Sequence, residues 1–157
     1  MRSRRPGFIM IAALLITVIL VVAGMAYLGS RVAQYRGAAK GLEAAQARAL
    51  ARAGIEDARV KLEKDYRFPP QSSYDQTIFT YSEDVKDGAT VVGSYTVSID
   101  ETHRRSPFFV LRITSVGVVG SRVSPSAQAT IRADLDTSTA DPNRVFRFLR
   151  WEESTNL

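Results

Sequence analysis

The most distinctive stretch of the sequence lies near its start: Arg4–Arg31 reads RRPGFIMIAALLITVILVVAGMAYLGSR. Its segment Phe8–Leu28 carries no charge and one aliphatic hydroxyl, that of Thr17. A helix rises about 1.5 Å per residue, so roughly 20 apolar residues cross a bilayer. Arg2, Arg4 and Arg5 precede the segment, and the denser positive charge stays in the cytoplasm. The pattern predicts a single span with a cytoplasmic N-terminus.

Two other interpretations fit the same stretch. A cleaved secretory signal has a basic start, an apolar core of about 7–15 residues and small residues before the cut. Gly24 and Ala26 form such a pair, which would place cleavage before Tyr27. A plain signal anchor would keep Met1 and remain in the membrane. The residues of this stretch leave these alternatives open.

The helical pattern continues beyond the apolar stretch. No proline occurs between Arg31 and Tyr66, and alanine is frequent throughout. We therefore expect one helix over Phe8–Asp65, about 85 Å long. It follows a basic leader at 1–7 and has two parts, a transmembrane or filament-core part at 8–30 and an extracytoplasmic Ala-rich part at 31–66.

The second part of this helix has two surface patterns. Small side chains, which let helix backbones approach closely, recur every fourth residue and form what we call the small-residue row: Ala33, Gly37, Gly41, Ala45, Ala49 and Ala53. Four residues exceed one turn by about 40°, so the row winds around the helix and suits several neighbours. The alternative is that its alanines serve only to favour the helix. Ile55, Ala58 and Leu62 follow three–four spacing and predict the patch that packs on the chain's own domain, with Tyr66 one turn further.

The rest of the chain, 67–157, has the texture of strands. Pro69 and Pro70 end the helical pattern. Alternating or β-branched segments at 89–100, 107–120 and 126–136 are joined by short polar turns, which predicts an antiparallel meander. TIFTYS (77–82) and RVFRFLRWEE (144–153) add edge strands. The sequence thus predicts an α+β fold, a long N-terminal helix packed on a small antiparallel sheet.

Composition and motifs argue against catalysis. The formal charge is +5, of which the three leader arginines supply three, and the remaining surplus of two does not predict nucleic-acid binding. The chain has no cysteine and one histidine, His103, in a polar turn. No nucleophile and base can be paired, and no phosphate-binding loop is present. We expect neither an enzyme nor a bound cofactor or metal.

Other polar and aromatic residues have ordinary structural interpretations. Two acidic clusters could offer oxygens to calcium but lack the spacing of a calcium loop, so we predict solvated turns at Glu83, Asp84 and Asp87 and at Asp134, Asp136 and Asp141. Arg104 and Arg105 are expected to be balanced surface charge. Phe146, Phe148 and Trp151 are expected to pack against the sheet, with a partner-docking stripe as the alternative.

Three stretches resemble type IV pilin and pseudopilin precursors. The first, RRPGFIMIAALL (4–15), resembles a class III leader. The second, AQARALARAGIEDARVKL (45–62), resembles the helix of PilX-like minor pilins and of the type II secretion K pseudopilin. The third resembles the closing strands of PilX-like domains and consists of FVLRITSVGVVG (109–120), AQATIRADL (127–135) and FLRWEE (148–153). The resemblance implies cleavage by prepilin peptidase between Gly7 and Phe8, with N-methylation of Phe8. The position of the glutamate found in most major pilins is Ala12 here, and the cysteines of many pilins are absent.

This resemblance implies a minor pilin or pseudopilin that assembles into, initiates or caps a filament. Its partners would be other pilin or pseudopilin subunits, prepilin peptidase and an inner-membrane assembly platform. It would reside in the bacterial cytoplasmic membrane as a single-pass protein and then in a periplasmic or surface filament. The competing class is a membrane-anchored extracytoplasmic scaffold or binding domain that does not polymerise.

Overall fold

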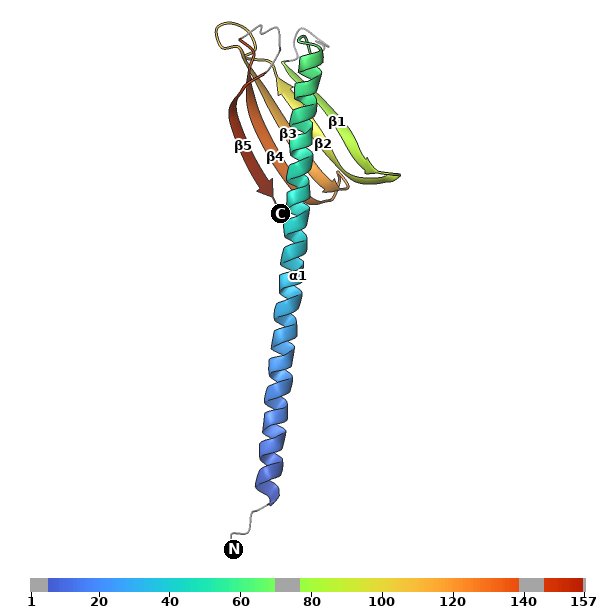
Figure 1. Cartoon of the computed structure of the whole chain (residues 1–157), viewed down its shortest axis with the longest axis vertical. Coiled ribbons are helices and arrows are strands. Elements are labelled where there is room, and N and C mark those ends of the chain that lie inside the picture. The colour runs from blue at the N-terminus through green and yellow to red at the C-terminus, as the bar shows by residue number, and fades with distance from the viewer. Residues whose placement is uncertain (1–5, 70–76, 139–145, 157) are drawn as a thin grey trace. The chain divides into compact units, whose positions relative to one another are not determined.

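The computed structural model describes residues 6–69, 77–138 and 146–156 (Figure 1). The chain divides into two compact units, 1–39 and 40–157. The described part of the first unit is entirely helical, and the second unit holds the end of the same helix, α1 (Pro6–Lys64), together with a sheet. The predicted α+β fold with one long N-terminal helix is confirmed.

The sheet has five strands in the order in which they occur along the chain. They are β1 (Ile78–Asp87), β2 (Thr90–Asp100), β3 (Val110–Gly120), β4 (Pro125–Asp136) and β5 (Phe148–Asn156). Every neighbouring pair is antiparallel, so the sheet is the predicted meander with β1 and β5 as its edges. Strand β1 runs through the segment that we predicted as an acidic turn.

In the second unit, α1 covers one face of the sheet (Figure 1). Ile55, Ala58 and Leu62 are fully buried, which confirms the predicted packing patch. Alternate residues of the central strands meet them, because successive side chains of a strand point to opposite faces. The strand side chains of this core are fully or almost fully buried: Tyr95, Val97, Ile99, Leu111, Ile113, Val119, Ala127, Ala129, Ile131, Ala133 and Leu135. Burial of one large aliphatic side chain contributes roughly 1.5–3 kcal/mol.

The ends of α1 differ slightly from the prediction. The helix begins at Pro6 instead of Phe8 because proline, which lacks an N–H, suits the first helical position. It ends at Lys64, one residue before the predicted Asp65. We had expected Tyr66 to continue the helical patch, but it lies beyond the end of the helix. It stacks on Phe146 and donates a hydrogen bond to the carbonyl of Thr137.

Two glycines allow the helix backbone to lie very close to the sheet. A Cβ built on Gly117 of β3 would lie 2.3 Å from the carbonyl oxygen of Ala47 and 2.3 Å from the amide nitrogen of Ala51. A Cβ built on Gly54 of α1 would lie 2.3 Å from Oγ of Ser115. Since real Cβ atoms do not approach other atoms so closely, the backbone contact at Gly117 requires glycine. At Gly54 the nearest obstruction belongs to the side chain of Ser115.

We expect Gly54→Ala to destabilise the protein by about 1–3 kcal/mol, because the added methyl overpacks the contact with Ser115. Among the residues that the structure describes, Ser115 Oγ is buried and has no hydrogen-bond partner, so Ser115→Ala removes the nearest obstruction and an unsatisfied hydroxyl. The double variant Gly54→Ala/Ser115→Ala should recover most of the loss. Thermal unfolding of the full-length protein in detergent, followed by circular dichroism, measures this coupling. Strictly additive effects of the two substitutions would contradict it.

Candidate membrane-spanning and helix-packing site

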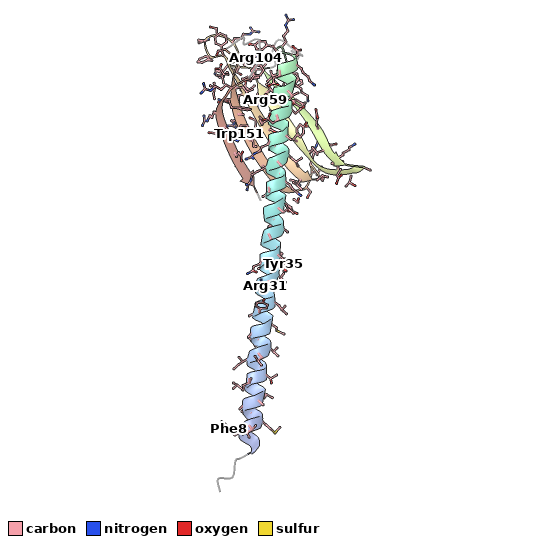
Figure 2. The ribbon with its side chains drawn as sticks, viewed as in Figure 1. Phe8, Arg31, Tyr35, Arg59, Arg104 and Trp151 are labelled. Atoms are coloured by element: carbon pink, nitrogen blue, oxygen red, sulfur yellow. The ribbon has the colours of Figure 1, made fainter. Side chains whose placement is uncertain are left out.

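The first half of α1 exposes apolar side chains on all sides. Its most apolar 18-residue window has a mean hydropathy of 2.9, and none of that window is buried inside the protein. Phe8 is 76% exposed, and large aliphatic side chains around the following turns are more than half exposed (Figure 2). The helix is long and apolar enough to cross a membrane. Such a surface requires a lipid or protein environment.

The predicted processing residues lie at the start of this helix. Gly7 and Phe8 both belong to the first turn of α1. The leader arginines Arg2, Arg4 and Arg5 lie outside the described residues. Ala12 is half-buried in the first unit. No acidic side chain is available within the apolar stretch, because the first acid of the chain is Glu43.

The small-residue row stays uncovered. All its members are exposed: Ala33, Gly37, Gly41, Ala45, Ala49 and Ala53. A Cβ built on Gly37 or Gly41 would meet no atom within 4 Å. The sheet packs instead on a different set of small helix residues, which are buried: Ala44, Ala47, Ala51, Gly54 and Ala58. The packing of the chain on itself therefore does not explain why the exposed row is small.

A polar network that sequence reasoning missed joins α1 to β1 and β2. Lys61 Nζ donates to Asp57 Oδ2 at 2.6 Å and to Glu83 Oε1 at 2.7 Å. Tyr81 donates to Asp57 at 2.8 Å, and Tyr95 donates to Glu83 at 2.8 Å. The Lys61 ammonium also lies 3.9 Å from the centroid of the Tyr81 ring. The four-residue spacing of Asp57 and Lys61 was the available sequence signal, but their strand partners depend on tertiary structure.

The network shifts the pKa values of its members. The hydrogen bond from Lys61, followed by that from Tyr95, lowers the pKa of Glu83 below its usual 4.5. Burial alone would lower the pKa of Lys61, but its bonds to Asp57 and Glu83 outweigh that effect and raise it. Burial and the hydrogen bond to Asp57 raise the pKa of Tyr81. These shifts favour the charged Lys61–Glu83 pair and neutral tyrosines, so the network acts as a clamp between the helix and the β1–β2 hairpin.

We expect acid to weaken this clamp. Because the folded pKa of Glu83 is depressed, its contribution is complete above pH 4.5 and is lost as the pH falls through the folded pKa. Glu83 is half exposed, so the contribution is at most about 1 kcal/mol. Glu83→Gln should lower stability at neutral pH and flatten the decline below pH 4.5. Fluorescence of the single tryptophan, Trp151, can follow unfolding at each pH.

Glu43→Gln is the control for this measurement. It removes a carboxylate of α1 that does not belong to the Lys61–Glu83 network, so it should leave the contribution of that network unchanged. Asp100, Asp136 and Glu153 also have lowered pKa values and keep part of the decline in every variant. An identical decline in Glu83→Gln and the unaltered protein would remove Glu83 from the acid response.

The acidic clusters are not solvated turns. Glu83, Asp84 and Asp87 lie in β1, where Glu83 belongs to the network and Asp84 pairs with Arg122 at 2.6 Å. Asp134 and Asp136 lie in β4, and Asp134 pairs with Arg112 at 2.9 Å. Asp141 lies outside the described residues. Within 6–69, 77–138 and 146–156, no group of three His, Asp or Glu side chains could hold a metal ion.

Arg104 and Arg105 behave differently from each other. Arg105 is exposed, as predicted. Arg104 is not surface charge: its guanidinium donates to the carbonyls of Tyr66 and Phe68 and pairs with Glu101. It thereby ties the end of α1 to the β2–β3 connection (Figure 2).

The remaining sequence candidates lie at the ends and edge of the sheet. His103 is exposed and contacts the ring of Phe108 edge-on. Phe146 is buried, as predicted, and Phe148 is half-buried against the core. The prediction that Trp151 is buried against the sheet is wrong, since 38% of this residue is exposed. Figure 2 labels its position. It lies on edge strand β5, where its ring N–H donates to Glu153, which in turn pairs with Arg52 of α1.

The sequence matches no protein-family model, and comparisons with curated proteins and with solved structures find no significant match.

Proposed function

We propose that this chain is a minor pilin or pseudopilin subunit that assembles into, initiates or caps a type IV pilus-like filament. The main support for this proposal is that different parts of the α1 surface suit different environments. Its first half is apolar and exposed all round, and its second half keeps the small-residue row exposed while another face packs on the sheet. One helix thus offers a surface for lipid and a surface for close contact with other helices.

In this proposal the chain first enters the bacterial cytoplasmic membrane with its N-terminus inside. Prepilin peptidase then cuts between Gly7 and Phe8, and Phe8 is N-methylated. The cut removes Arg2, Arg4 and Arg5, whose charges hold the N-terminus at the cytoplasmic surface. An assembly platform in the inner membrane then moves the helix from lipid into contact with the helices of sibling subunits. The chain performs no catalysis and holds no cofactor.

Ala12 supports a place at the filament tip. In most major pilins a glutamate occupies this position and is thought to pair with the terminal amine of a neighbouring subunit. A carboxylate inside a membrane is costly unless it is paired. A subunit with alanine at this position lacks that pairing group. Such a subunit suits the tip of the filament, where it need not pair with a subunit ahead of it.

The experiment determines the N-terminal residue of the protein from native membranes and from sheared surface material, by mass spectrometry. We expect a start at Phe8, with one added methyl group. A bulky substitution, Gly7→Leu, should abolish this product and the surface-assembled protein because it blocks the peptidase, while the protein stays in the membrane. Ala26→Leu, within the apolar stretch and one residue before the alternative cleavage site, is the matched control and should be processed normally.

The other outcomes identify the competing classes. A start at Met1 in all fractions would make the chain a membrane-anchored scaffold or binding domain that does not polymerise. A start at Tyr27 would make the apolar stretch a secretory signal. Normal surface assembly of Gly7→Leu without cleavage would also overturn the proposal.

A further inference from the structure

A basic and aromatic segment follows the apolar stretch within the first unit. It contains Tyr27, Arg31, Tyr35 and Arg36, and we call it the Tyr27–Arg36 segment. Tyr35 is 74% exposed. Arg31 and Tyr35 lie about one helical turn from each other, and both side chains extend from the surface of the helix (Figure 2). The sequence has no acidic residue before Glu43. The positive charges of this segment therefore have no acidic partner nearby along the helix.

The side chain of Arg31 points back toward the apolar stretch. Its Nε and Nη2 donate to the Tyr27 hydroxyl at 2.9 Å and 2.7 Å, and its guanidinium carbon lies 5.0 Å from the centroid of that ring. Its third hydrogen bond is also to a neutral group, the side-chain oxygen of Gln34. Cα–Cβ bonds tilt toward the N-terminus of a helix, so long side chains that follow a span lean toward the membrane.

The spacing places these groups at a membrane boundary. At about 1.5 Å per residue, Arg31 lies about 4.5 Å beyond Leu28, the last residue of the apolar stretch. The headgroup layer on each side of a bilayer is roughly 5–8 Å thick. Tyr27 then lies at the edge of the hydrocarbon, where tyrosine is enriched. Arg31 lies among the headgroups. Arg36 lies about 12 Å beyond Leu28, and its side chain approaches the headgroups because long side chains lean toward the N-terminus of the helix.

We propose that the Tyr27–Arg36 segment binds the phosphate groups of anionic phospholipids at the end of the span. Guanidinium groups donate paired hydrogen bonds to phosphate oxygens, and the planar Arg31 is held in place by Tyr27. Charge complementarity favours an acidic surface, and continuity with an apolar helix surface favours the bilayer over a soluble acidic protein. This inference rests on the membrane insertion in the proposed function, but not on filament assembly.

The test uses the full-length protein in nanodiscs made from equal parts of phosphatidylcholine and phosphatidylglycerol. After partial removal of lipid, native mass spectrometry counts the lipids of each kind that remain on the protein. We expect phosphatidylglycerol to be retained preferentially at low salt and less so at high salt. In Arg31→Gln/Arg36→Gln the preference should fall, by roughly fivefold for each arginine in full contact with the headgroups.

The control is Arg105→Gln/Arg147→Gln, which changes the net charge equally at two exposed arginines of the second unit. It should keep the preference of the unaltered protein. An equal preference in all three proteins, or an equal loss in the control, would overturn the inference. Failure of the chain to insert would overturn it together with the membrane anchor. Insertion with the expected preference but without cleavage at Gly7 would reject the filament role alone.

Discussion

Gly117→Ala should destabilise the second unit by about 3 kcal/mol or more, which is at the upper end of overpacking effects. The added methyl would collide with backbone atoms of Ala47 and Ala51, at 2.3 Å each. A backbone cannot rotate away as a side chain can, so α1 would have to move off the sheet. That movement would open space around Ala47 and Ala51, which are fully buried. Thermal and denaturant unfolding of the full-length protein in detergent would measure the loss.

Gly41→Ala is the matched control for this prediction. It makes the same chemical change at a helical glycine whose Cβ would meet nothing within 4 Å. Because alanine favours helix over glycine, we expect it to stabilise the protein slightly, by up to about 1 kcal/mol. Equal stabilities of Gly117→Ala and the unaltered protein would contradict the close packing of α1 on β3.

Gly37→Leu/Gly41→Leu should abolish filament assembly and leave the fold intact. Both glycines are exposed, and a Cβ added at either would meet no atom within 4 Å. Large side chains at these positions would keep the backbones of neighbouring helices apart. We therefore expect normal membrane insertion and unchanged unfolding of the second unit, with at least about a tenfold loss of protein from the sheared surface fraction, equivalent to roughly 1.4 kcal/mol of assembly free energy.

The control for this variant is Val32→Leu/Ala39→Leu. It adds leucines on roughly the opposite side of the helix, at positions that are also exposed. Assembly should be retained because these positions do not belong to the small-residue row. If the Gly37→Leu/Gly41→Leu protein assembled normally, the row would have no part in contacts between subunits.

Several elements could be predicted because their signals are local. The apolar composition of Phe8–Leu28 and the absence of proline up to Tyr66 predicted a long helix, and α1 spans Pro6–Lys64. Alternation along the strands predicted the meander. The three–four spacing of Ile55, Ala58 and Leu62 predicted the buried helix face. Each of these signals is a period or a composition within one segment, which the chain carries without reference to its distant parts.

Other features depended on contacts between distant segments. The acids of β1 were interpreted as a turn because charge suggests solvent, yet Glu83 lies opposite Lys61 of the helix. Arg104 was predicted to be surface charge, but in the folded chain its guanidinium donates hydrogen bonds to the carbonyls of Tyr66 and Phe68. Trp151 was expected to be buried against the sheet, but it lies on edge strand β5 and 38% of it is exposed.

Local composition and periodicity were enough to predict the long helix, its apolar first half, the antiparallel strands and the face that α1 buries. The need for glycine at position 117 and the exposure of the small-residue row became visible only in the folded chain. The physical reason is that composition and periodicity act within a segment. Close approach and exposure depend on which residues of α1 and the sheet meet, and this is set when the whole core packs.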